Sequence, residues 1–213
     1  MKCDTSLGRK LTFSELNPNL KFVALSVPIK NRIFICGGGG KSSLARSIQK
    51  KQGNVHIELD ACKFLPNWKE RTVDEFREFT INEIKNAKDQ WVIEGNYTEK
   101  LGNLILKDSE LIIWLDLSWE VVFRRIFFRS IRRCFNKHTI CGRNYETWGQ
   151  FFSRDSLWWY YLVKRSKITE EHKEFLQLVP SEIPILRIRN PGELSVLYEM
   201  HELELIGEDQ LSN

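Results

Sequence analysis

The chain has 213 residues, of which 42% are hydrophobic and 28% are charged, and its formal net charge is +4. These values are ordinary for a globular protein and do not require nucleic acid as a partner. No apolar run approaches the ~18 residues of a membrane span, and no signal-peptide pattern opens the chain. The five cysteines are odd in number and scattered, which argues against a disulfide framework and favours a reduced, cytoplasmic setting.

Apolar runs that alternate with helical patterns predict an α/β protein. We expect residues 1–30 to be an N-terminal extension, with a short strand in "KFVALSV", and residues 31–213 to form a single domain. The expected strands are residues 32–36, 54–60, 91–96, 110–117 and 183–190. The expected helices are residues 41–51, 72–87, a long helix after Ser118 to about 133, an interrupted stretch over 146–178 and a last helix from 191. Three of them are expected to open on the caps Thr72, Ser118 and Asn190. This order indicates a parallel sheet covered by helices on both faces, with ligands at the carboxyl ends of the strands.

The sequence "RIFICGGGGKSSLARSI" joins the first expected strand of the domain to its first helix. Glycine-rich loops in this context cradle phosphates with backbone N–H groups, a lysine neutralises the phosphates, and a serine hydroxyl binds Mg²⁺. Ile35 stands where the full G-x-x-x-x-G-K-[ST] pattern has its first glycine, so either that glycine is replaced or the loop is one residue shorter. A simple glycine turn is the alternative that we favour less. The expected nucleotide-binding residues are Gly37, Gly38, Gly39, Gly40, Lys41, Ser42 and Ser43.

Three carboxylates stand at the ends of expected strands, where a metal ion or a phosphate acceptor would bind. Glu94 is followed by Gly95, which allows a ligand to approach, and we expect Glu94 to bind Mg²⁺ together with Ser42. Asp60 is expected to contact the acceptor and to orient or deprotonate it. Asp116 lies two residues before a helix cap, so we favour a structural turn at that position. For Asp60 and Glu94, the alternative is a carboxylate satisfied by nearby backbone N–H groups.

Residues 121–145 contain six arginines, a lysine and no acidic residue. Such a helix suits a mobile lid, because arginines stabilise charge on a transferring phosphoryl group and a closed lid excludes water. A nucleic-acid surface and a solvated basic face are the alternatives that we favour less. Cys134, His138 and Cys141 lie in the same stretch, but their spacing fits no standard zinc site, so ordinary cysteines are favoured and zinc is left open.

The segments "RIFICGGGGKSSLAR", "IELDACKFLPNW", "WVIEGNYTEK", "IIWLDLSWEVVFRRIFFRSIRR" and "ETWGQFFSRDSL" together resemble the adenylate kinase-like proteins of the DNA topology modulation protein family. The resemblance covers residues 32 to 190. It implies a three-layer fold of the P-loop nucleoside-monophosphate-kinase type, with a five-stranded parallel sheet and an arginine-rich helical lid over about residues 125–160.

The same resemblance implies roles for particular side chains. Arg125 and Arg129 correspond to two arginines that contact the phosphates of ATP, and Arg143 and Arg154 are similar to a second pair on the far side of the lid. "EGNY" replaces the family's wider acceptor turn, which leaves the acceptor contact open. The implied substrate-binding residues are Asp60, Trp68, Arg71, Glu94, Gly95 and Asn96.

Taken together, the residues predict an ATP- and Mg²⁺-dependent kinase that moves a γ-phosphoryl group to a small acceptor such as a nucleoside or nucleotide. Lys41, Asp60 and the four arginines would be its catalytic residues. The alternatives are a DNA-associated regulatory protein that uses the basic helix and a pseudo-kinase that binds nucleotide without turnover. The identity of the acceptor, the oligomeric state and the role of residues 1–30 stay open at this point.

Overall fold

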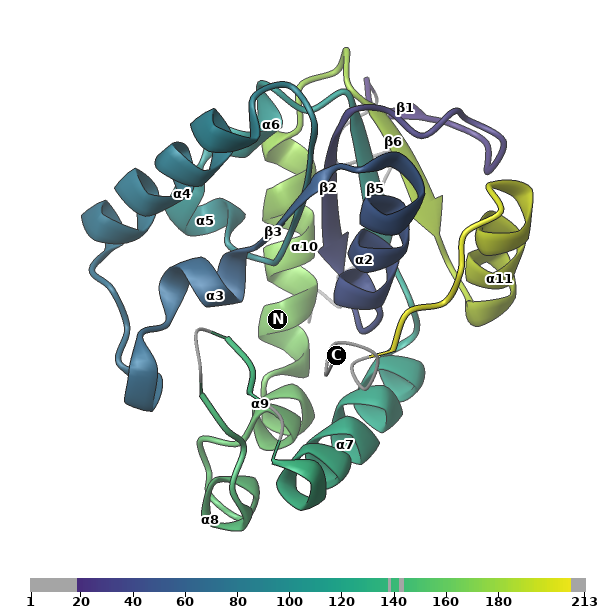
Figure 1. Cartoon of the computed structure of the whole chain (residues 1–213). Coiled ribbons are helices and arrows are strands. Elements are labelled where there is room, and N and C mark those ends of the chain that lie inside the picture. Colours follow the sequence, from purple (N-terminus) through teal and green to yellow (C-terminus); the bar gives the residue numbers. More distant parts are fainter. Residues whose placement is uncertain (1–18, 138, 142–143, 208–213) are drawn as a thin grey trace, which may run out of the picture.

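The protein contains one parallel β-sheet with helices on both of its faces (Figure 1). The computed structural model describes residues 19–137, 139–141 and 144–207. Within them the sheet has six strands in the order β1-β6-β5-β2-β4-β3, and all five pairings are parallel. The strands are β1 (Lys21–Phe22), β2 (Arg32–Gly37), β3 (Val55–Glu58), β4 (Trp91–Glu94), β5 (Leu111–Leu115) and β6 (Pro184–Ile188).

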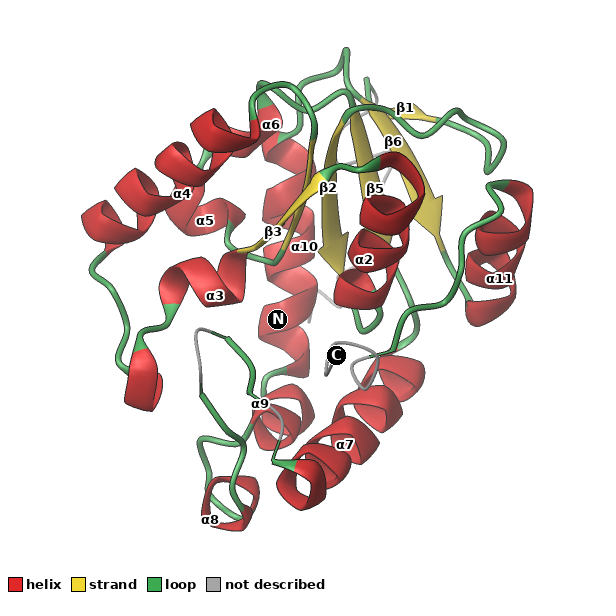
Figure 2. Cartoon of the chain, in the orientation of Figure 1, coloured by secondary structure: helices red, strands yellow, loops and turns green. Residues whose placement is uncertain are grey.

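The helices form the two outer layers and a further group beyond the carboxyl ends of the strands (Figure 2). They are α2 (Lys41–Gln52), α3 (Leu59–Lys63), the short 3-10 helix η1 (Pro66–Trp68), α4 (Val73–Ala87), α5 (Thr98–Leu101), α6 (Asn103–Leu106), α7 (Trp119–Asn136), α8 (Trp148–Phe151), α9 (Leu157–Val163), α10 (Arg165–Leu178) and α11 (Pro191–Met200). One face of the sheet packs against α2, α11 and the start of α7, and the other packs against α3 to α6 and α10. The predicted three-layer α/β architecture is therefore confirmed.

The central strand β2 shows why the sheet needs both layers. Its side chains alternate, so that Phe34 and Cys36 join one core cluster while Ile33 and Ile35 join the other. All four are buried. A strand that is apolar on both faces is typical of a parallel sheet covered on both sides, because neither face can be left in water.

The prediction of five strands is wrong, because the expected extension contributes a sixth. Lys21 and Phe22 form a two-residue strand at the edge of the sheet, in register with Pro184 and Ile185 of β6. Val23 continues the pairing by donating its N–H to the carbonyl of Ile185 at 3.0 Å. The short strand predicted in residues 21–27 is therefore confirmed, although only its first two residues are assigned to it.

Two of the three predicted helix caps are confirmed, whereas Ser118 precedes α7 but its side chain makes no capping hydrogen bond. Thr72 accepts a hydrogen bond from the N–H of Glu75, whose carboxylate accepts one from the N–H of Thr72, so α4 begins with a capping box. The Asn190 side chain accepts a hydrogen bond from the N–H of Glu193 and caps α11. In both cases the local sequence contains every group that the cap needs.

The strands point toward the segment formed by α7, α8 and α9, residues 119–163, which lies beyond their carboxyl ends (Figure 1). We call these residues the α7–α9 segment. In the described ranges, no helix has both the length and the apolar character that a bilayer crossing requires.

Candidate functional site

A cavity of about 740 Å³ opens at the carboxyl edge of the sheet. Its walls come from the loop after β2, the ends of β3 and β4, helix α3, and helices α7 to α10. Parallel sheets place their ligand sites at this edge, because the loops that follow neighbouring strands diverge there. Most of the predicted site residues converge on this cavity.

The four glycines predicted to bind phosphate, residues 37–40, form a tight connection between β2 and α2, which we call the glycine loop. Ile35 is fully buried within β2 and pairs with Glu94 and Ile113, so the position of the first motif glycine lies inside the sheet. The strand continues to Gly37 and the helix begins at Lys41. Of the two alternatives for Ile35, the structure therefore supports the shortened loop.

Two glycines of this loop are required by packing alone. Gly37 has a φ of +97°, and a Cβ there would lie 2.4 Å from the carbonyl oxygen of Leu115. A Cβ on Gly38 would lie 2.3 Å from a methyl group of Val122. Both distances are far below van der Waals contact, so no larger residue fits at either position without a shift of the backbone or of α7. Gly38 is buried and does not line the cavity, whereas Gly37, Gly39 and Gly40 do.

The start of α2 presents unpaired donors to the cavity. Gly40 is its N-cap and supplies no side-chain cap, and the first turn contains no acidic residue. Among the described residues, no acceptor is recorded for the N–H groups of Gly39 and Gly40. The Lys41 ammonium folds back onto the carbonyl of Gly37 at 3.2 Å. Unpaired N–H groups, a helix N-terminus and a lysine in one place form a site that attracts anions.

Asn96 and Arg125 brace the glycine loop from two sides. The Asn96 amide accepts the N–H of Gly37 at 2.8 Å and donates to the carbonyl of Gly37 at 3.0 Å. Arg125 donates to the carbonyl of Gly39 at 2.6 Å. Asn96, predicted to contact the acceptor, also lines the cavity, whereas Arg125, predicted to contact phosphates, does not.

Glu94 and Ser42, the predicted metal ligands, lie together. Glu94 is 3% exposed, and its Oε1 has no hydrogen-bond partner among the described residues. Burial opposes the charge of Glu94, but the His56 imidazole, the Lys41 ammonium and the Ser42 hydroxyl together hold its pKa below the usual value. The Nε2 of His56 lies 3.8 Å from Oε1, which is an ion-pair distance and too long for a hydrogen bond.

Asp60 does not end a strand as predicted, because β3 stops at Glu58 and Asp60 lies in the first turn of α3. Its Oδ1 accepts the phenol O–H of Tyr97 at 2.5 Å. Glu58, which the sequence reasoning missed, is the register partner of Glu94 on the neighbouring strand. Burial, followed by the charges of Glu94 and Asp60, raises the pKa of Glu58 to about 7.

Only some of the arginines in and after α7 reach the cavity. Arg129 and Arg133 line the cavity, and Arg133 binds Glu146 at 3.0 Å in a largely buried pair. Arg154, predicted to be catalytic, is exposed and does not line the cavity. Arg143 lies outside the described residues, as does His138.

On the acceptor side, Trp68 and Gly95 line the cavity as predicted, whereas Arg71 does not. Arg71 donates to the carbonyl of Cys62 at 2.6 Å and stacks over the ring of Phe79, so its contacts are structural. Ser43 lies outside the wall as well. Asp116 was expected to serve a local turn; its carboxylate instead accepts two hydrogen bonds from Arg187 on β6, at 2.8 and 2.5 Å.

Further residues line the cavity that the sequence reasoning did not select. Glu58 could have been found from strand alternation, since it shares a face with His56 in "HIELD", and Arg133 from its spacing of four after Arg129. Tyr97 and Lys63 carry no comparable signal, because their place depends on how α3 and the loop after β4 pack. Among these residues are Glu58, Lys63, Tyr97, Arg133 and Glu146.

The site thus combines an anion-attracting helix start, one buried and two half-buried carboxyl groups, and two arginines around one cavity. This combination suits a phosphorylated ligand with a bound cation. Comparison with known proteins adds no identification, because no protein-family model and no curated protein sequence matches the chain.

Proposed function

We propose that the protein is an ATP-dependent phosphotransferase of the P-loop kinase type, which moves the γ-phosphoryl group of ATP to a hydroxyl of a small acceptor such as a nucleoside or nucleotide. The observation that carries the proposal is the position of Lys41 and Ser42. They form the first turn of α2, directly after the glycine loop, and both face the cavity at the carboxyl edge of the sheet. A polyphosphate bound there would replace the contact between Lys41 and the carbonyl of Gly37.

The cation expected with ATP has a fitting donor set. The Ser42 hydroxyl and the Glu94 carboxylate are oxygen ligands of the kind that Mg²⁺ prefers, and Oε1 of Glu94 is buried without a hydrogen bond among the described residues. When bound, Mg²⁺ would neutralise part of the phosphate charge. The Lys41 ammonium would neutralise another part, and the N–H groups of Gly39 and Gly40 would orient the phosphate oxygens.

The acceptor would bind at the opposite wall. Trp68 and Tyr97 supply aromatic surfaces there, and Asp60 supplies a carboxylate that is oriented by the Tyr97 hydroxyl. A carboxylate held in place can accept the proton of an attacking hydroxyl or align it for attack.

The α7–α9 segment would serve as the arginine-bearing lid of such an enzyme. Arg129 and Arg133 line the cavity from α7, four residues apart on one face of the helix. They are better placed to stabilise the transferring phosphoryl group than Arg125 and Arg154. Because the same segment covers the carboxyl edge, its closure would also limit the access of water.

The proposal is tested by incubating the full chain with ATP, Mg²⁺ and a panel of nucleosides, nucleotides and other hydroxyl compounds, while ADP formation and the mass of each acceptor are followed. Lys41→Ala should lower turnover at least about a hundredfold, the order of loss expected when one electrostatic contact to the reacting group is removed. Lys50→Ala is the matched control, because Lys50 is an exposed lysine on the same helix, paired with Glu204.

A panel in which no acceptor gains mass and Lys41→Ala changes neither ATP binding nor turnover contradicts the proposal. Nucleotide binding that depends on Lys41, with no transfer to any acceptor, identifies the pseudo-kinase instead. DNA binding that weakens steeply with salt and on Arg129→Ala or Arg132→Ala, without ATP, identifies the regulatory protein.

A further inference from the structure

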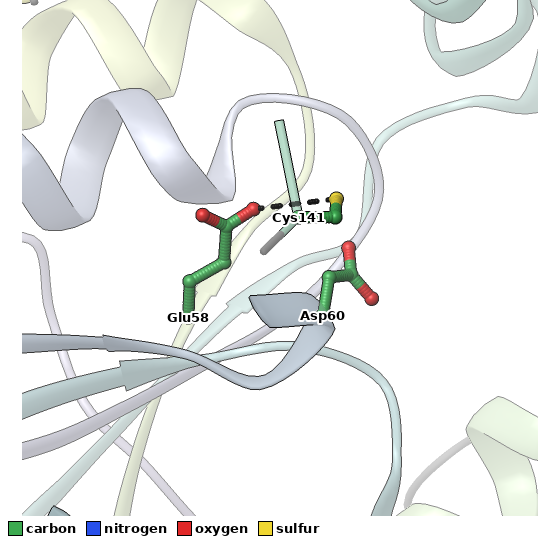
Figure 3. A group of neighbouring side chains, drawn as sticks. All are labelled: Glu58, Asp60 and Cys141. Atoms are coloured by element: carbon green, nitrogen blue, oxygen red, sulfur yellow. Dashed lines mark hydrogen bonds between the residues drawn. The ribbon is translucent and has the colours of Figure 1, made fainter. Parts of the chain in front are cut away.

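Three side chains with metal-binding atoms meet at the edge of the cavity (Figure 3). Glu58 ends β3, Asp60 lies in the first turn of α3, and Cys141 comes from the loop between α7 and α8. One metal-binding atom of each lies within 4.8 Å of the others, and the Cys141 thiol donates a hydrogen bond to Oε1 of Glu58 at 3.8 Å. Tetrahedral zinc with its usual bonds to sulfur and oxygen separates two such ligands by about 3.6 Å. The sulfur and Oε1 already have nearly this separation.

A second observation points to a ligand at the same place. Glu94 is the register partner of Glu58 and lines the same cavity. It is 3% exposed, yet its Oε1 has no hydrogen-bond partner among the described residues, and neither has the neighbouring Nε2 of His56. Nε2 and Oε1 lie 3.8 Å apart, so each is the ion-pair partner of the other, at a separation too long for a hydrogen bond. Buried polar atoms are almost always hydrogen-bonded, so this gap beside Glu58 leaves a place for a water or an ion.

The side chains of the cluster are held by contacts from outside it. The Tyr97 hydroxyl donates to Asp60 and fixes the orientation of that carboxylate. Asn144, which is 2% exposed, donates to the carbonyl of Cys141 at 2.6 Å and to that of Leu65 at 3.0 Å. Cys141 itself has a φ of +43°, which is uncommon for a residue with a side chain. Asn144 therefore positions the thiol over the sheet edge, and outer contacts of this kind orient metal ligands.

The charge around the cluster also matters for a cation. Glu58, Asp60 and Glu94 bring three carboxyl groups to one wall of the cavity. The nearest basic groups of α7 are Arg129 and Arg133, and Arg133 is paired with Glu146. Lys41 lies beside Glu94 and lowers its pKa, so the two carboxyl groups that remain for an added cation are those of Glu58 and Asp60.

We propose that Glu58, Asp60 and Cys141 bind a divalent cation of the zinc class, with a fourth coordination position open to the cavity. A thiolate selects a borderline-soft metal, whereas carboxylates alone would suit Mg²⁺ or Ca²⁺. Binding releases the thiol proton to solvent and forms the metal–sulfur bond. The site is distinct from the Cys134, His138 and Cys141 combination in the sequence, since it uses only Cys141 of those residues. The site shares Asp60 with the proposed acceptor wall, so Asp60 would be a ligand, and not a proton acceptor, whenever the cation is bound.

The test is a titration of the metal-free full chain with Co²⁺ in the presence of a reductant, followed by the ultraviolet charge-transfer band of a thiolate bound to cobalt. The wild type should develop this band to a stoichiometry of about one Co²⁺ per chain. Cys141→Ser should abolish it, and Glu58→Gln should weaken the apparent affinity at least about tenfold. Zn²⁺ should displace the cobalt and remove the band.

Cys134→Ser and Cys3→Ser are the matched controls and should leave the band unchanged, and circular dichroism of every variant shows whether it is folded. The proposal is overturned if the wild type develops no thiolate band, or if the band survives in Cys141→Ser. Because neither ATP nor an acceptor is present, failure of this site leaves the kinase proposal standing, and the reverse also holds.

Discussion

Glu58→Gln offers the most direct test of the electrostatics of the cavity. The pKa of Glu58 is raised from 4.5 to about 7, with burial as the first cause and the charges of Glu94 and Asp60 next. A carboxyl group with a raised pKa in the folded state binds its proton more tightly there than in the unfolded chain. The free energy of unfolding of the wild type should therefore fall as the pH rises from about 4.5 to about 7.

The size of this effect follows from the shift. Each unit of pKa difference corresponds to 1.36 kcal/mol, so a group that titrates near 7 instead of 4.5 costs about 3 kcal/mol of stability once it is ionised in the folded state. Glutamine has nearly the same shape and does not ionise. Glu58→Gln should thus be close to the wild type in stability near pH 4.5 and more stable by about 3 kcal/mol at pH 8.

Urea unfolding from pH 4.5 to pH 8.5, with a chelator present so that no cation occupies the site, measures the difference. His56, Asp60, Glu94, Cys141 and Arg133 also influence this position, but they are common to both proteins, so the difference between the two curves isolates Glu58 to first order. Glu99→Gln removes the same charge from an exposed position on the cavity wall and should show no such pH-dependent gain. A stability difference that stays constant over this pH range would refute the reasoning.

Three further predictions concern the scaffold and are checked by urea unfolding at pH 7. Gly38→Ala should destabilise the protein by about 1–3 kcal/mol, because the new methyl group would lie 2.3 Å from a methyl group of Val122. In a Val122→Ala background the same substitution should cost clearly less, and an equal loss of stability in both backgrounds would disprove the clash. Asn190→Ala should cost about 1 kcal/mol by removing the cap of α11, while Asn190→Ser should retain most of that stability. Asp116→Asn should cost about 1–3 kcal/mol, since it weakens a partly buried pair with Arg187; an effect that screens away in 1 M salt would show that the pair is effectively exposed.

Local sequence determined the parts of this protein that depend on neighbouring residues. The capping box at Thr72 and the cap at Asn190 contain donor and acceptor within four residues, and the structure has both. Buried strands such as β2 are apolar on both faces, which is enough to place them in a covered parallel sheet. The glycine loop and the first turn of α2, with Lys41 and Ser42, could also be placed at the carboxyl edge of the sheet from sequence, because the loop directly joins β2 to α2.

Only the tertiary structure decided which distant side chains meet. Glu58 faces Glu94 because β3 pairs with β4 in a particular register, and Cys141 reaches Glu58 because Asn144 holds its loop against residues 65–68. Arg125 braces the glycine loop while Arg129, one turn further along α7, faces the cavity, and this division depends on how the helix docks. The local pattern predicted a strand in residues 21–27, but only the sheet order shows that it adds to the edge beside β6. Such contacts arise from the packing of the sheet and its helices, which is a property of the whole chain and which no short stretch of sequence contains.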